Sequence, residues 1–210
     1  MSLEVSGLTV QHHGFKLQGV SFHISKGGVL SMMGRSGIGK TTLVEALCGL
    51  RRSSTGYIKL DGRDVHELRP SERGIGLVPQ DGALFAHMTV QQHLEFAPRI
   101  HGWARGRQSD RVEEIASLLG LSSLLNRLPA EISGGEQKRV AIGRAITVSP
   151  VLLCLDEAFS GLDDHSVDQI VASLIPILKQ EAITTLHITH SRKEAELLGG
   201  ETLLIESLIS

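Results

Sequence analysis

Eight consecutive residues near the start of the chain have the types and spacing of a phosphate-binding loop. The segment 34–41 fits the pattern G-x-x-x-x-G-K-[S/T]. Its glycines let backbone N–H groups surround phosphate oxygens, and a following helix adds the positive end of its dipole. Lys40 would neutralise the β and γ oxygens, and the Thr41 hydroxyl would be a ligand for Mg²⁺. The predicted nucleotide contacts are Gly34, Arg35, Ser36, Gly37, Ile38, Gly39, Lys40, Thr41 and Thr42.

This loop predicts binding of a nucleoside triphosphate. The N-K-x-D sequence that reads guanine does not occur in the chain, so ATP is favoured over GTP.

Two acids follow a run of apolar residues later in the chain. Asp156 and Glu157 come directly after Val151–Leu155. Neighbouring strand residues point in opposite directions, so the two carboxylates can have different roles. Asp156 would hold Mg²⁺ directly or through water, and Glu157 would orient and deprotonate the attacking water. Without the phosphate loop upstream, two solvated acids at a strand end would be the preferred interpretation.

The segment Ser133–Gln137 has two compatible interpretations. Ser-x-x-Glu is a capping box, which would simply begin a helix. However, Gly134 and Gly135 disfavour a first turn by about 1 kcal/mol each. Glycines there leave bare N–H groups at a positive helix end, open to a phosphate.

The histidines give no metal pattern. His187 and His190 are three residues apart on a strand that runs into a loop, so we expect their side chains on opposite faces. Neither H-E-x-x-H nor a Cys/His ligand spacing occurs, so no zinc site is predicted. By position alone, His190 is more simply a structural residue.

Hydrophobic patterning predicts a parallel sheet with helices on both sides. Unbroken apolar runs such as Val151–Leu155 are typical of strands buried on both faces. The predicted strands are Leu3–Val10, Gly19–Ile24, Val29–Met33, Tyr57–Leu60, Gly76–Pro79, Val151–Leu155, Thr184–Ile188 and Thr202–Ile205. The predicted helices are Gly39–Leu50, Arg111–Leu119, Gly135–Thr147, Ser166–Ile175 and Ser191–Leu198. We expect Pro176 to end or kink the fourth of these, and helical signals over Thr89–Thr147 indicate an insertion in an α/β core.

Composition narrows the function classes. The 210 residues carry 21 Lys and Arg against 23 Asp and Glu, a net charge of −2, which argues against binding nucleic acid through bulk charge. No apolar run is long enough to span a bilayer, and no secretion signal is recognisable, so we expect a soluble intracellular protein.

Cys48 and Cys154 are interpreted as reduced core residues. The basic residues Arg99, Arg105, Arg107 and Arg111 are interpreted as a solvated helix face rather than a contact for a partner or acidic lipid.

Together with further motifs, these residues resemble the ATP-binding cassette (ABC) transporter ATPases over essentially the full chain. Gln80 is similar to the Q-loop glutamine, and Ile132–Gln137 to the signature motif. Asp156 and Glu157 are similar to the Walker B aspartate and the catalytic glutamate. Ser160–Asp163 is similar to the D-loop, and His190 to the switch histidine.

The resemblance implies an α/β P-loop NTPase (RecA-like) core with an N-terminal antiparallel β subdomain and an inserted α-helical subdomain. Residues 1–210 would form one ABC ATPase domain, with its core at 1–86 and 148–210 and its helical part at about 87–147.

The resemblance also implies a mechanism. Two copies would form a head-to-tail homodimer with two ATP, each held by the phosphate loop of one copy and by Ser133 and Gly135 of the other. Gln80 would sense Mg²⁺ and water and contact the coupling helix of an integral membrane permease. His190 would contact the γ-phosphate, and Asp163 would link the two sites.

As partners, the resemblance implies that permease and an extracytoplasmic solute-binding protein, with no nucleic acid. The location would be peripheral, on the cytoplasmic side of the membrane. The segment 82–90 is similar to import-type members of the family.

Some positions depart from the family pattern. Glu136 and Ala158 replace the usual glutamine and proline, and Gly199-Gly200 also differs. Glu136 would repel a phosphate unless it folds back as a cap. His13 falls where an adenine-stacking tyrosine is common.

Three other functions stay open at this point. A small-molecule kinase would share the phosphate loop, but it would place a substrate hydroxyl where Glu157 places water. A non-transport ABC ATPase acting on DNA or ribosomes would add coiled coils or a second cassette. A catalytically silent cassette is disfavoured by Lys40, Glu157 and His190.

Overall fold

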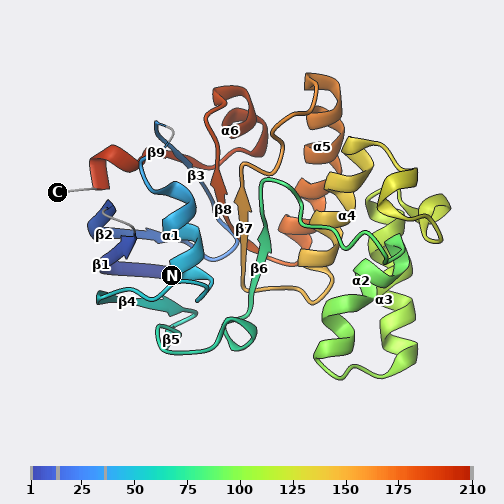
Figure 1. Cartoon of the computed structure of the whole chain (residues 1–210), viewed down its shortest axis with the longest axis horizontal. Coiled ribbons are helices and arrows are strands. Elements are labelled where there is room, and N and C mark those ends of the chain that lie inside the picture. The colour runs from blue at the N-terminus through green and yellow to red at the C-terminus, as the bar shows by residue number, and fades with distance from the viewer. Residues whose placement is uncertain (1, 13–14, 36, 209–210) are drawn as a thin grey trace.

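The computed structural model describes residues 2–12, 15–35 and 37–208, which form two sheets with helices around them (Figure 1). The first sheet is antiparallel, with strand order β2-β1-β4-β5. Its strands are β1 (Leu3–His12), β2 (Phe15–Ile24), β4 (Thr55–Leu60) and β5 (Arg63–Asp64). This sheet is the expected N-terminal antiparallel part of the fold.

The second sheet is parallel and forms the centre of the molecule, with strand order β6-β7-β8-β3-β9. Its strands are β3 (Val29–Met33), β6 (Ile75–Val78), β7 (Leu152–Asp156), β8 (Thr184–Ile188) and β9 (Glu201–Leu204). Every residue of β7 and β8 is buried, which confirms the strands predicted from the unbroken apolar runs.

Strand β7 contributes to two separate hydrophobic cores. Leu152 and Cys154 pack in the core that includes α1 (Lys40–Leu47) and the antiparallel sheet. Leu153 and Leu155 point the other way, into the core that includes α4 (Gly134–Ile146) and α5 (Asp164–Gln180). Helix α1 therefore covers one face of the parallel sheet, and α4 and α5 cover the other.

The remaining helices complete the second layer. Helices α2 (Val90–Ile100) and α3 (Arg105–Leu118) pack with α4, and α6 (Arg192–Leu198) packs beside α5. Short 3₁₀ turns occur at η1 (Pro70–Glu72), η2 (Ser122–Leu124), η3 (Pro129–Glu131) and η4 (Ile205–Leu208). The architecture is the predicted P-loop NTPase fold with a mainly helical part between β6 and β7. Within the described ranges, no helix is both long and apolar enough to cross a membrane.

Three sequence-based expectations about packing can be compared with the structure. Helix α5 continues through Pro176 to Gln180, so Pro176 does not end the helix, and the alternative of a kink stays a prediction; buried Leu174, Ile177 and Leu178 hold both sides of the proline in the core. Arg111 does not belong to a solvated face, because it donates to Thr147 O and pairs with Glu181 at 2.6 Å. Cys48 and Cys154 are free and buried, as expected.

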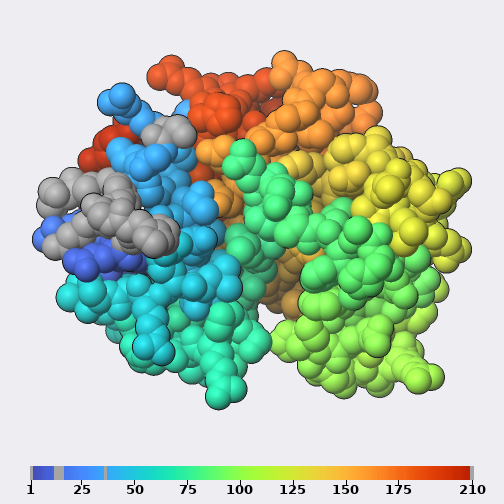
Figure 2. Space-filling view, viewed as in Figure 1, coloured from blue at the N-terminus to red at the C-terminus, as the bar shows by residue number. Residues whose placement is uncertain are grey.

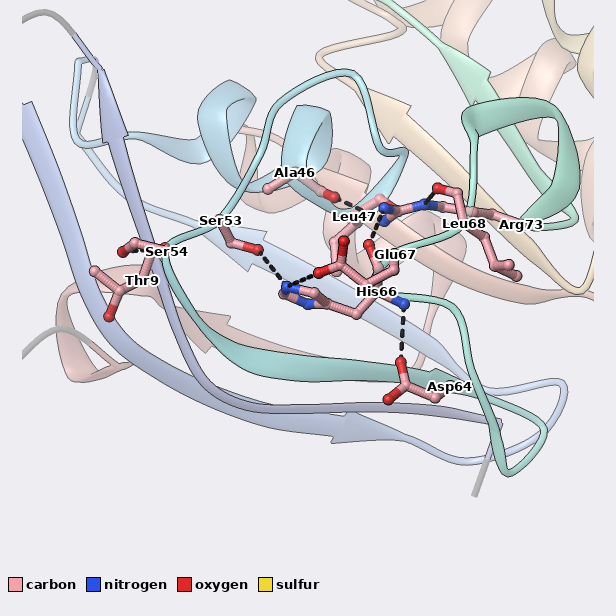
Figure 3. Close-up of polar contacts among 10 residues, drawn as sticks. All are labelled: Thr9, Ala46, Leu47, Ser53, Ser54, Asp64, His66, Glu67, Leu68 and Arg73. Carbon is pink, nitrogen blue, oxygen red and sulfur yellow. Dashed lines mark hydrogen bonds and ion pairs between the residues drawn. The ribbon is translucent and has the colours of Figure 1, made fainter.

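A buried arginine ties the segment before β6 to the end of α1 (Figure 3). The Arg73 guanidinium donates to Ala46 O at 3.0 Å and Leu47 O at 2.7 Å, at the C-terminal end of the helix. It also donates to Leu68 O at 3.0 Å and His66 O at 2.5 Å. A cation at this position supplies a donor to Leu47 O and a second donor to Ala46 O, which also accepts from Gly49 N at 3.1 Å, and it interacts favourably with the negative end of the helix dipole.

We expect Arg73→Met to lower the free energy of unfolding by about 3 kcal/mol or more, since the thioether leaves buried carbonyls without a donor. Urea unfolding of the purified protein measures this loss. The control is Arg52→Met, which removes the same charge from an exposed neighbouring position and is expected to change stability by less than about 0.5 kcal/mol. Equal losses for the two variants would contradict the role assigned to Arg73.

Candidate nucleotide-binding site

The phosphate loop joins β3 to α1, as the sequence predicts. Gly39 precedes the helix with φ of 98°, a conformation that favours glycine, and no side chain caps α1 there. The first N–H groups of α1 are consequently available to an anion. Lys40 is buried and donates to Gly34 O at 2.8 Å and Arg35 O at 3.0 Å, so its ammonium lies inside the curve of the loop. Ser36 lies outside the described residues.

Asp156 and Thr41 are brought together at the end of β7. Asp156 is buried, and its Oδ1 has no hydrogen-bond partner among the described residues. Burial raises the pKa of Asp156, while a hydrogen bond from the Thr41 side chain opposes that rise and the neighbouring Glu157 adds to it. The free carboxylate oxygen of Asp156 and the neighbouring hydroxyl of Thr41 are both oxygen ligands of the kind that Mg²⁺ prefers.

Glu157 occupies a tight turn directly after β7. Its φ is +47°, and its N–H donates to Ile188 O at 3.0 Å, which fixes the turn to the neighbouring strand. Glu157 Oε2 lies 4.0 Å from His190 Nδ1, and the two side chains are 24% and 71% exposed. A carboxylate and an imidazole thus stand together at an open edge of the site, where water has access.

Gln80 lies beside the turn that follows Glu157. Gln80 Nε2 is 3.4 Å from Ser160 Oγ, and Lys138 of α4 donates to Gln80 O. A cavity of about 210 Å³ is lined by Asp81, Gly82 and Leu84, by Gly134, Gln137 and Lys138, and by residues 160–162. The segments that resemble the Q-loop, the signature motif and the D-loop are therefore neighbours. In the described part of the chain no contact joins Gln80 to Thr41 or Asp156, so a Gln80 contact with Mg²⁺ stays a prediction.

Ser133 and Glu136 form the capping box that the sequence predicts. Ser133 N and Oγ donate to Glu136 Oε2 at 2.7 and 2.8 Å, and Glu136 N donates to Ser133 Oγ at 3.3 Å. The bonds from the Ser133 backbone and side chain lower the pKa of Glu136. The carboxylate is thus folded back as a cap, and Gly134 and Gly135 remain free of any close neighbour that a Cβ would strike.

Asp163, in the segment that resembles the D-loop, has a local structural role. Asp163 caps α5, accepting bonds from Ser166 N at 2.9 Å and Ser166 Oγ at 2.7 Å, and these bonds lower its pKa. A role in linking two nucleotide sites stays a prediction.

One contact at the phosphate loop has no signal in the sequence. Glu206 of η4 accepts a bond from Arg35 N at 3.0 Å, across 171 residues. That bond, with the nearby Lys40 and Arg35 charges, lowers the pKa of Glu206. Gly34 lies against Ile205 and Glu206 so closely that a Cβ would be 2.5 Å from Ile205 Cγ2. His13, the predicted adenine contact, lies outside the described residues.

A groove of about 560 Å³ lies on the lower edge of the molecule, between residues 70–79 and the end of α2 (Figure 2). Its lining includes Leu77, Phe85, Phe96 and Trp103, with Pro150 and Val151 just before β7. The groove is largely apolar and is separate from the phosphate loop.

The chain matches a known protein family and has curated relatives. Residues 17–160 match the family model described as "ABC transporter". The chain is 38% identical over 199 residues to the molybdate/tungstate import ATP-binding protein WtpC of Thermococcus kodakarensis, covering 95% of this chain and 60% of that protein. It is 33% identical over 208 residues to the sulfate/thiosulfate import ATP-binding protein CysA of Synechocystis sp., covering 99% of this chain and 59% of the relative.

A third relative is the sn-glycerol-3-phosphate import ATP-binding protein UgpC of Pectobacterium atrosepticum. The two are 36% identical over 194 residues, or 92% of this chain and 54% of that protein. The chain thus spans 54–60% of the length of these relatives.

Proposed function

The chain belongs to the ABC transporter family, and on that premise we propose that it is the ATP-hydrolysing subunit of an import system. In this proposal two copies associate head to tail around two ATP. They act on a separate membrane permease from the cytoplasmic side, and an extracytoplasmic solute-binding protein delivers the solute. The relatives named above import oxyanions or a phosphorylated solute, so a small anion is the proposed class of cargo.

The observation that carries the proposal is the separation of two phosphate-binding elements within one copy. The phosphate loop begins α1 on one face of the parallel sheet, whereas Ser133 and Gly135 begin α4 on the other. Both helix starts have N–H groups suited to an anion. A head-to-tail pair would bring the α4 start of one copy to the phosphate loop of the other and complete each site.

Hydrolysis in this proposal depends on residues at and around the end of β7. Glu157 would accept a proton from the attacking water, and His190 would hold the γ-phosphate and orient Glu157. Lys40 would bind the β and γ oxygens. Thr41, Gln80 and Asp156 would hold Mg²⁺, which would neutralise phosphate charge when bound.

The apolar groove is the proposed permease contact. Residues 70–79 border the groove and directly precede Gln80, the predicted sensor of the nucleotide. A permease helix seated in the groove would therefore contact the segment that leads to Gln80. This arrangement supports coupling of hydrolysis to the permease.

Mixing two inactive variants tests the shared site. Ser133→Arg places a long cation where the second copy would approach, and Lys40→Ala removes the ammonium from the phosphate loop. Each alone is expected to lose hydrolysis, because both sites of its dimer carry a defect. In a mixed dimer one site carries both defects and the other carries none, so an equal mixture should recover up to about a quarter of wild-type turnover.

The measurement is phosphate release at a fixed total protein concentration, with Ser133→Arg also tested for nucleotide binding, which should be retained. Unimpaired turnover in the Ser133→Arg protein alone would argue that each copy carries a complete site.

A further inference from the structure

A buried histidine–carboxylate pair lies behind the turn that carries His190, and the proposed reaction does not use it. His187 on β8 is fully buried, with Nδ1 3.2 Å from Ser31 Oγ on β3. Its ring lies against Phe159, with the centroids 5.6 Å apart. Its Nε2 lies 3.5 Å from Glu194 Oε2 and has no aligned hydrogen-bond partner among the described residues. The carboxylate of Glu194 therefore faces this buried imidazole.

Glu194 also forms hydrogen bonds with Thr189 and Ser191, the two chain neighbours of His190. Its Oε2 accepts a hydrogen bond from the Thr189 hydroxyl, and that hydroxyl accepts one from Ser191 N at 3.0 Å. Glu194 N in turn donates to Ser191 Oγ at 3.3 Å. Thr189 N donates to Met32 O at 3.2 Å, which anchors the turn to the strand that leads into the phosphate loop.

The carboxylate is held in its charged form. Burial by itself would raise the pKa of Glu194, but the contacts with His187 and Thr189, and the nearby His190, outweigh burial and lower that pKa. Its side chain is 15% exposed. A buried charge is stable only with such partners, so the network is a specific arrangement rather than a solvated acid on a helix.

His190 is held mainly through its chain neighbours, Thr189 and Ser191. Its side chain is 71% exposed, and its Nδ1 lies 4.0 Å from Glu157 Oε2. An exposed imidazole stays in one place only if the turn beneath it is fixed. We infer that Glu194, backed by His187, is a positioning residue that sets where the His190 imidazole stands relative to Glu157. This inference rests on the proposed role of His190 in hydrolysis.

Changes at Thr189 and Glu194 test the inference through turnover and KM. Thr189→Val keeps the shape but removes the hydroxyl, so we expect kcat to fall about tenfold with the KM for ATP within about twofold. Thr189→Ser restores the hydroxyl and should stay near wild type. Glu194→Gln should cause a smaller fall in kcat, since its amide oxygen still accepts from Thr189. The matched control is Glu196→Gln, an exposed acid on the same helix, which should change neither constant.

A double-mutant cycle separates positioning from general damage. If Glu194 and Thr189 act through His190, Thr189→Val should cost less than about twofold in kcat once His190→Ala is present. The same tenfold loss in both backgrounds would overturn the inference while leaving the role of His190 intact. An unchanged kcat for His190→Ala alone would reject the proposed role of His190, and the inference with it. If Thr189→Val does not fold, the same cycle with Glu194→Gln carries the test.

Discussion

Replacing Glu157 with glutamine is expected to lower kcat for ATP hydrolysis by about 10²- to 10⁴-fold, the range for losing a general base. The amide keeps the size of the side chain but cannot take a proton from water. Its position is set by the bond from Glu157 N to Ile188 O and by the positive φ of the turn, neither of which depends on the carboxylate. Affinity for ATP should therefore be retained, and the protein should accumulate as an ATP-bound dimer.

Phosphate release and size-exclusion chromatography with ATP and Mg²⁺ measure the two parts of this result. Glu113→Gln on the exposed side of α3 is the control for loss of one negative charge. Ordinary turnover in the Glu157→Gln protein would remove Glu157 from the role of base. Slow turnover without dimer accumulation would instead count against the shared site.

Lys40→Ala is expected to abolish measurable hydrolysis, a loss of at least about 10³-fold, typical of removing a cation from a phosphoryl-transfer site. Two effects combine in this variant. The ammonium that would neutralise the β and γ oxygens is lost, and so are its bonds to Gly34 O and Arg35 O, which fold the loop. Nucleotide affinity should fall by about tenfold or more, since a charge-assisted contact to phosphate disappears.

Isothermal titration with ATP and steady-state phosphate release measure these losses. Lys26→Ala removes the same charge from a position that is 68% exposed and should leave both quantities unchanged. If the Lys40→Ala protein kept full ATP affinity and turnover, the segment 34–41 would not be the nucleotide site.

Much of the fold follows from local sequence patterns. The apolar run that ends at Leu155 predicts a doubly buried strand, and β7 is one; the glycines before Lys40 predict a loop between strand and helix, and this is the observed connection. The helices of the insertion follow less clearly from local patterns. Pro98 interrupts the pattern of α2, and α3 begins at Arg105 with few buried residues, so the sequence does not mark where either helix begins and ends. Helix α5 continues beyond Pro176, where a local pattern favours an end or a kink, because buried residues on both sides of the proline pack in the core.

The motifs of the candidate site can be predicted from the sequence, but the contacts between residues far apart in the chain cannot. A capping box involves residues three apart, so Ser133 and Glu136 can be read from the chain. The contacts of Glu206 with Arg35 and of Ser31 with His187 join residues 171 and 156 positions apart. Such contacts depend on which strands become neighbours, and that information is not local.

The five-residue strand β7 joins the two regions on which the proposed function depends. At one end are the acids Asp156 and Glu157, and just before its other end Pro150 and Val151 line the apolar groove. Because the strand is hydrogen-bonded on both sides and packed on both faces, it is stiff along its axis. If the proposed function holds, we expect a displacement at the acidic end to reach the groove, about 17 Å away, through movement of β7 as one rigid element, with no chain of rearranging side chains in between.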